Sequence, residues 1–126
     1  MDFRDSPEEA AFRSEARAWL EANAPARDPA EIEPGVFEHW PSAAQMQAAR
    51  AWQRRKYDAG WAGVFWPTEH GGRGGSVMQQ IIWDQEERRV VTPPAVLLMG
   101  QGHVGYTLLA HGAAEQKARW LPPTLR

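Results

Sequence analysis

A glycine pattern near the end of the chain is the first candidate for a ligand site. Gly100, Gly102 and Gly105 form Gly-x-Gly-x-x-Gly, which in dinucleotide-binding folds brings a pyrophosphate onto a helix N-terminus. That function requires a strand before the glycines and an acidic residue ~20 positions beyond them. Residues 95–99 could pose as the strand, but no acidic residue follows Trp120. We therefore favour a helix whose glycines let another backbone or a ligand approach closely.

A second glycine-rich stretch, residues 71–75, could cradle a phosphate, because free backbone amides before a helix N-terminus attract anions. It lacks the Lys-Ser/Thr ending of a nucleotide-binding P-loop. A tightly turned or mobile loop is the interpretation that we favour.

Other chemistry finds little support in the residue types. The sequence has no cysteine, which excludes disulfides, thiolate catalysis and cysteine-based zinc sites. No two of the histidines stand three or four residues apart, so no helical metal pair exists. These histidines are His39, His70, His103 and His111. No Ser/His/acid grouping stands out, and no metal or catalytic residue is assigned.

Charged runs are interpreted as exposed surface. Residues 54–56 (Arg-Arg-Lys), flanked by Trp52 and Tyr57, resemble a nucleic-acid patch, but the formal net charge of −2 favours a solvated helix face. The run that contains Asp84, Glu86 and Glu87 beside two arginines is expected to form exposed ion pairs.

Composition bounds the class of protein. With 126 residues, 43% hydrophobic and 24% charged, the chain suits one globular domain. It opens without a secretory signal, and its longest apolar run is too short to span a bilayer, so we expect a cytoplasmic protein. Seven tryptophans predict either an aromatic core or rings that face a partner.

Helix-start signals position these candidates. Capping boxes at Ser6/Glu9, Ser42/Gln45 and Ser76/Gln79 predict helices that end before Pro25, near Ala59 and near Val91. Four apolar residues should form the buried face of the first helix: Phe12, Ala16, Trp19 and Leu20. Ile81, Ile82 and Gln85 should share one face of the third helix. Residues 24–40 read as a loop.

Two more helices are expected toward the end of the chain. One spans residues 94–110, and a short one spans residues 113–121 and is closed by Pro122 and Pro123. No segment alternates with period two, so the fold class is all-α, with five or six helices.

Two stretches resemble the acyl-CoA dehydrogenase family. In residues 57–76 (YDAGWAGVFWPTEHGGRGGS) a helix ends in a Gly-aromatic pair, and Pro-x-Glu-x-Gly-Gly-x-Gly follows. Residues 108–122 (LLAHGAAEQKARWLP) are similar to the segment that leads out of the family's N-terminal helical domain. The resemblance implies that residues 1–126 are this domain, an orthogonal or up-down helical bundle. It also implies that the family's β-domain and second helical domain are absent.

The resemblance implies a function in oxidoreduction and fatty acid or lipid metabolism. A complete flavoprotein of this family dehydrogenates an acyl-CoA thioester at the α,β bond with FAD and passes electrons to an electron-transfer flavoprotein. It usually assembles as a homo- or hetero-oligomer. The N-terminal domain supplies one wall of the acyl pocket. The matching positions here are Ala95, Val96, Met99 and His103. A polar residue at 103 suggests a polar or bulky acyl group.

Flavin and catalytic base belong to the absent domains in this comparison. We therefore expect the isolated fragment to bind no flavin, to be inactive and to self-associate through bare surfaces. The alternatives are a non-catalytic helical interaction module that pairs with a separate chain carrying the flavin and base, and a small nucleotide-binding module built on residues 100–105.

Overall fold

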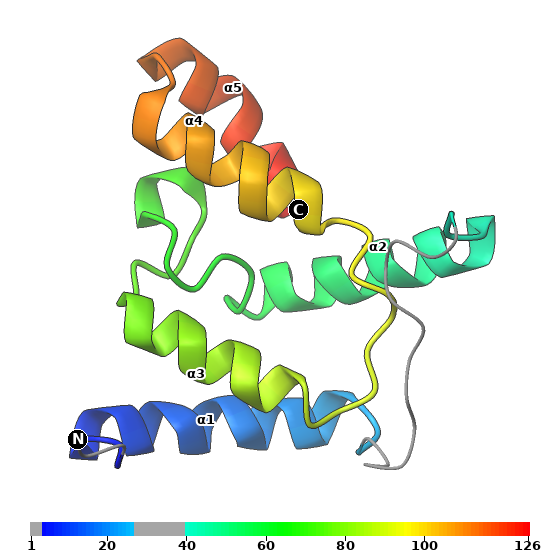
Figure 1. The fold of residues 1–126 in the computed structure, drawn as a ribbon, viewed down its shortest axis with the longest axis vertical. Coiled ribbons are helices and arrows are strands. Elements are labelled where there is room, and N and C mark those ends of the chain that lie inside the picture. Colours follow the sequence, from blue (N-terminus) through cyan, green and yellow to red (C-terminus); the bar gives the residue numbers. More distant parts are fainter. Residues whose placement is uncertain (1–3, 27–39) are drawn as a thin grey trace.

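The computed structural model describes residues 4–26 and 40–126, and most of the predicted loop at 24–40 lies outside them. Five α-helices, a 3₁₀ turn and a π-helical segment follow one another (Figure 1). They are α1 (Pro7–Asn23), α2 (Ala43–Asp58), η1 (Thr68–His70), α3 (Val77–Glu87), η2 (Met99–Val104), α4 (Gly105–His111) and α5 (Ala114–Leu125). Apart from one isolated bridge between Ala26 and Val90, the described residues contain no β-structure. The all-α prediction is confirmed.

All three predicted capping boxes are present. Ser6, Ser42 and Ser76 each accept a hydrogen bond from the amide three residues later, at 3.2, 3.2 and 3.1 Å. Each serine amide in turn donates to the side chain of that later residue. These reciprocal bonds satisfy amides that a helix start would leave without partners. The beginnings of α1, α2 and α3 are thus set by local sequence.

The principal core joins α1 to α3, which lie against each other in Figure 1. Phe12, Ala16 and Leu20 are buried along one face of α1, as predicted, and Trp19 is half-buried beside them. Ile82 and Trp83 of α3 pack against this face, together with Trp61 of the loop between α2 and α3. Trp61 and Trp83 stack with ring centroids 4.7 Å apart.

A second, smaller core lies under α5. Leu121 and Leu125 pack against Ala62 and Trp66, which lie in the loop at residues 60–76 that we call the glycine loop. The Gln53 amide of α2 donates to the Leu125 carbonyl oxygen at 2.7 Å. The loop at residues 60–76 therefore separates and supports two helical layers, α1/α3 and α4/α5.

The prolines do not end the last helix where the sequence suggested. α5 continues through Pro122 and Pro123 to Leu125. Proline cannot donate to the carbonyls of residues 118 and 119, but both of these residues are exposed, so water can serve instead. Burial of two leucines on one face of α5 compensates for the lost bonds.

Two further boundaries differ from prediction. α3 ends at Glu87 rather than near Val91, and its buried face is Ile82, Trp83 and Glu86, whereas Ile81 and Gln85 are exposed. Residues 94–97 are not helical, because Val96 and Leu98 make short turn bonds back to Pro94 and Ala95. A regular helix has no capping side chain there, and the helical segment begins only at η2.

The aromatic core that the number of tryptophans suggested is present. Trp61, Trp66 and Trp83 are buried, whereas Trp40 is 95% exposed and Trp120 is half-exposed. No helix among the described residues has the length and apolar character needed to cross a membrane.

Candidate functional site

The backbone amides of the glycine loop donate hydrogen bonds to carbonyl oxygens of the same loop. Amides of residues 71–75 donate to loop carbonyl oxygens at 2.8 to 3.1 Å. The acceptors are Thr68, Pro67, Gly63, Trp66 and Val64, in that order. A Cβ at Gly72 would lie 2.2 Å from the Trp66 carbonyl oxygen, which explains the glycine there. The loop therefore offers no cradle for a phosphate or for a flavin pyrophosphate, and the prediction of a tight turn is confirmed.

Arg73 in this loop closes the main core. Its guanidinium lies 4.0 Å from the ring centroid of Trp61 and donates to Glu15 at 2.6 Å. A cation over an indole face is a favourable contact. Arg73 thus joins the glycine loop to α1.

The second glycine pattern lies in a helical segment. Gly100 and Gly102 belong to the π-helix η2, and Gly105 begins α4. No strand precedes them within residues 40–126, so the context of a dinucleotide site is missing. A Cβ at Gly105 would lie 2.3 Å from the Trp66 ring, so the close neighbour is a side chain rather than the backbone or ligand that we predicted.

The four predicted wall residues lie on or next to this segment. Ala95, Met99 and His103 recur every four residues and are exposed, Met99 by 54%. Val96 is half-buried in the turn before η2. We call these three exposed residues the outer row; Met99 and His103 lie on η2, whereas Ala95 precedes it. Ala95 also borders the cavity described next.

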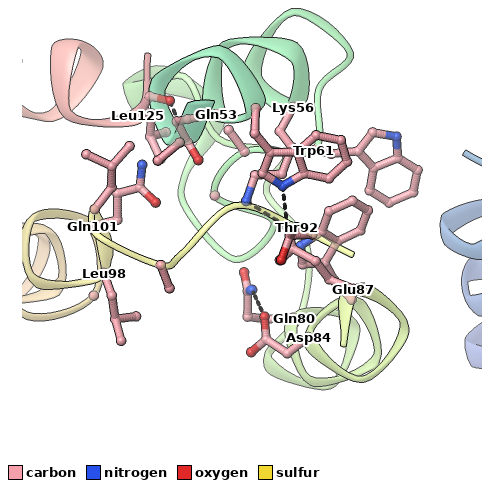
Figure 2. Close-up of a pocket in the computed structure, with 18 of the residues that line it drawn as sticks. Gln53, Lys56, Trp61, Gln80, Asp84, Glu87, Thr92, Leu98, Gln101 and Leu125 are labelled. Carbon is pink, nitrogen blue, oxygen red and sulfur yellow. Dashed lines mark hydrogen bonds and ion pairs between the residues drawn. The ribbon is translucent and has the colours of Figure 1, made fainter. Parts of the chain in front are cut away.

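A cavity of about 430 Å³ lies between α2, α3 and the segment that ends in α4 (Figure 2). Its lining includes the buried residues Trp61, Trp66, Trp83 and Leu125. On the η2 and α4 side it is lined by Leu97, Leu98, Gln101, Gly102 and Tyr106. We call this the central cavity. Its volume is within the range of roughly 300–1,000 Å³ typical of small-molecule sites.

Polar groups on α2 and α3 line the opposite side of the central cavity. Lys56 Nζ and Trp52 Nε1 both donate to Glu87 Oε1 at 2.9 Å, and Gln80 donates to Asp84 at 2.9 Å (Figure 2). Burial raises the pKa of Asp84. The charges of Lys56 and Glu87 neutralise each other. These groups can hydrogen-bond a neutral ligand, but the Lys56–Glu87 pair provides no unpaired charge for an ionic one.

The acidic run on α3 is not the exposed surface that we predicted. The Glu86 side chain is 3% exposed and accepts hydrogen bonds from Arg13 at 3.0 Å and from Arg17 at 2.8 and 3.0 Å. Hydrogen bonds from Arg17 hold the pKa of Glu86 below its usual value. No local pattern in the sequence distinguishes Glu86 from its acidic neighbours, because the arginines that bind it are some seventy positions away. This carboxylate joins α1 to α3.

The basic run at 54–56 is only partly solvated. Arg54 and Arg55 are exposed, as predicted, but Lys56 turns inward to Glu87. Three acidic or histidine side chains that could hold a metal ion do not gather anywhere in the two described stretches. His39 lies outside the described residues.

Sequence reasoning missed the central cavity. On the η2 and α4 side the lining residues lie close together in the sequence, between Pro93 and Tyr106. The lining residues on the opposite side come from α2, the glycine loop and α3, so no local sequence pattern predicts that they meet.

Comparison with known proteins gives a consistent assignment. Residues 6–126 match the family model described as acyl-CoA dehydrogenase, N-terminal domain. Acyl-CoA dehydrogenase IpdE1 of Mycolicibacterium smegmatis is 35% identical over 114 residues, which cover 90% of this chain and 29% of that protein. Acyl-CoA dehydrogenase FadE29 of Mycobacterium tuberculosis is 46% identical over 79 residues, covering 62% and 20%. The chain spans less than a third of the length of these relatives.

Solved structures agree with this match. The Tcur3481-Tcur3483 steroid ACAD superposes with a TM-score of 0.72 and 30% identity, covering 99% of this chain and 30% of that one. The ChsE4-ChsE5 complex from Mycobacterium tuberculosis has a TM-score of 0.63 at 22% identity, covering 99% and 29%, a likeness of fold. The helices, the glycine loop and the match over residues 6–126 lead to one conclusion: the chain belongs to the acyl-CoA dehydrogenase family and carries its N-terminal helical domain.

Proposed function

We propose that this domain forms one wall of the acyl pocket in a flavin-dependent acyl-CoA dehydrogenase. The observation that carries the proposal is the outer row, Ala95, Met99 and His103, which stands exposed on a helical segment of a domain of that family. A surface of this kind suits a substrate or a neighbouring domain better than water.

Within the proposed enzyme this domain contributes shape rather than chemistry. In the family reaction a carboxylate removes the α-proton, and the flavin supplies the acceptor for the hydride that leaves the β-carbon. Because the amides of the glycine loop are bonded within the loop itself, we place neither role there. Ala95 and Met99 would contact the acyl group, with His103 and Val96 bordering it.

We further propose a bulky ring-bearing acyl group and assembly with a second, different chain. The likeness to a structure titled as a steroid ACAD of two named chains supports both points. His103 supports the first as well, because an imidazole suits a polar group on the acyl chain better than a plain fatty tail does. An electron-transfer flavoprotein is the expected electron acceptor.

The experiment compares two histidine variants in the holoenzyme that contains this domain. Steady-state kcat/KM is measured for a steroid-side-chain CoA thioester and for hexanoyl-CoA. His103→Leu should shift the ratio of the two values toward hexanoyl-CoA about tenfold, the size of an effect from one pocket residue. His111→Leu is the matched control, since His111 is equally exposed but lies at the end of α4. An unchanged ratio would sink the wall assignment, and no turnover of any acyl-CoA would sink the activity.

A non-catalytic interaction module is the second candidate. Val77, Met78 and Ile81 are exposed together on α3 and suit a protein partner. Purification with a companion chain that carries the flavin, without any effect of His103→Leu on turnover, would favour this function.

A further inference from the structure

We propose that Gly105 determines how large an acyl group the proposed pocket admits. The absence of a side chain at this position lets the segment formed by η2 and α4 lie directly on the Trp66 ring. A segment that lies deeper leaves more room on its other side, where Met99 and His103 are exposed. This inference rests on the proposed function, because it takes these two residues as part of the acyl wall.

Gly105 has no space for a side chain. It is buried, and a Cβ there would lie 2.3 and 2.7 Å from Cζ2 and Cη2, two carbon atoms of the six-membered ring of Trp66. Carbon atoms in favourable contact are ~3.5 Å apart or more, so a methyl group at residue 105 would have to lie about 1 Å farther from the ring. Either the tryptophan or the helical segment must then move.

Trp66 is held in place on several sides. It is 1% exposed and packs with Leu121 and Leu125 of α5. Its amide donates to the Gly63 carbonyl oxygen at 3.0 Å, and its own carbonyl oxygen accepts from the Gly74 amide at 2.8 Å. Because a packed interior transmits a displacement rather than absorbing it, the ring is not the part that moves.

The helical segment is free to move on its outer side. Neighbouring residues of a helix point ~100° apart, so residues 103 and 105 face nearly opposite directions. Gly105 is buried against Trp66, whereas His103 is exposed and Met99 is 54% exposed. A methyl group at residue 105 therefore carries Met99 and His103 outward, toward the acyl group in the proposed enzyme. Loss of space for one methylene group in a pocket changes discrimination between substrates roughly 10- to 200-fold.

Three variants of the holoenzyme that contains this domain test the proposal: Gly105→Ala, Trp66→Phe and the two combined. Steady-state kcat/KM is measured for a steroid-side-chain CoA thioester and for hexanoyl-CoA. Gly105→Ala should lower the ratio of the first value to the second about tenfold. Trp66→Phe removes the ring atoms that the new methyl group meets, so the double variant should recover most of the original ratio. Gly102→Ala is the matched control, because its Cβ would make only ordinary contact with Leu98 Cδ1 at 3.5 Å.

The double variant separates a change in pocket width from a loss of stability. Trp66→Phe removes buried apolar surface, so the double variant should melt below the unmodified protein. Recovery of the substrate ratio in a less stable protein is the result expected of a residue that positions the wall. Trp66→Phe alone only opens space beneath the segment and should not lower the ratio. A tenfold fall in that variant would overturn the proposal, even if Gly105→Ala did not fold.

Crystal structures of the unmodified holoenzyme and of Gly105→Ala, superposed on residues 60–76, measure the displacement itself. The Cα atoms of Met99 and His103 should move by about 1 Å away from Trp66. Four further results would overturn the proposal: an unchanged ratio in folded Gly105→Ala, an equal fall in Gly102→Ala, no recovery in a folded double variant, or movement of the Trp66 ring instead of the segment. A protein that turns over no acyl-CoA would reject the proposed activity, whereas the displacement would still decide whether Gly105 sets the position of the segment.

Discussion

Replacing Glu86 with glutamine should loosen the contact between α1 and α3. Glu86 is 3% exposed, and its two oxygens accept three hydrogen bonds from Arg13 and Arg17. Arg89 Nε lies 3.6 Å from Glu86 Oε2. Glutamine keeps one acceptor oxygen but removes the negative charge that these arginines surround. The arginines would then repel one another across an uncharged amide.

The expected loss lies below the value for a fully buried pair. Breaking a buried ion pair costs roughly 3–5 kcal/mol, but Arg13 and Arg17 are 23% and 41% exposed, so water stabilises them after the change; we expect about 2 kcal/mol. Because each 1.4 kcal/mol corresponds to a factor of ten, amide hydrogen exchange in α1 and α3 should be about thirtyfold faster.

Hydrogen exchange detected by mass spectrometry reads this change locally, whatever other domains the protein carries. Glu115→Gln is the control, because Glu115 is exposed at the start of α5. Exchange in α4 and α5 should be unchanged by Glu86→Gln. An increase below threefold in α1 and α3 would show that the ion cluster contributes little and would refute this reasoning.

Two more predictions follow from the same contacts. Since hydrogen bonds from Arg17 lower the pKa of folded Glu86, its stabilisation is complete above the unfolded pKa of ~4.3 and disappears as the pH falls through the lower folded value. The difference in exchange between the unmodified protein and Glu86→Gln should therefore vanish in acid; a difference that persists at low pH would contradict it. Gly105→Ala should cost roughly 1–3 kcal/mol in denaturant unfolding, because the new Cβ meets the buried Trp66 ring at 2.3 Å. Gly102→Ala, whose Cβ would make only ordinary contact with Leu98 Cδ1 at 3.5 Å, should be neutral or stabilising, and equal effects of the two would be inconsistent with the packing described.

The sequence predicted those helix boundaries that depend on hydrogen bonds between residues close together in the chain. A serine and a glutamine or glutamate three residues later suffice for a capping box, so the starts of α1, α2 and α3 could be read directly. The end of α5 could not, because its prolines are outweighed by Leu121 and Leu125 packing on a distant loop. The same holds for Glu86, whose burial depends on arginines of α1, and for residues 94–97, where turn bonds replace the expected helix.

The candidate site residues also differ in whether the sequence alone could predict them. The outer row followed from the family resemblance and a spacing of four, and its role stays a prediction. The central cavity required the three-dimensional arrangement of α2, α3 and η2, since its lining comes from three separate stretches of the chain within residues 49–66, 80–88 and 92–106, together with Leu125.

One measurement tests the central claim most directly. The holoenzyme that contains this domain is mixed with a steroid-side-chain CoA thioester in the absence of oxygen, and its flavin absorbance near ~450 nm is followed, the band of an oxidised flavin cofactor. The account predicts rapid bleaching by the thioester, slowed by His103→Leu and not by His111→Leu. Absence of a flavin band, or a band that no acyl-CoA bleaches, would contradict it.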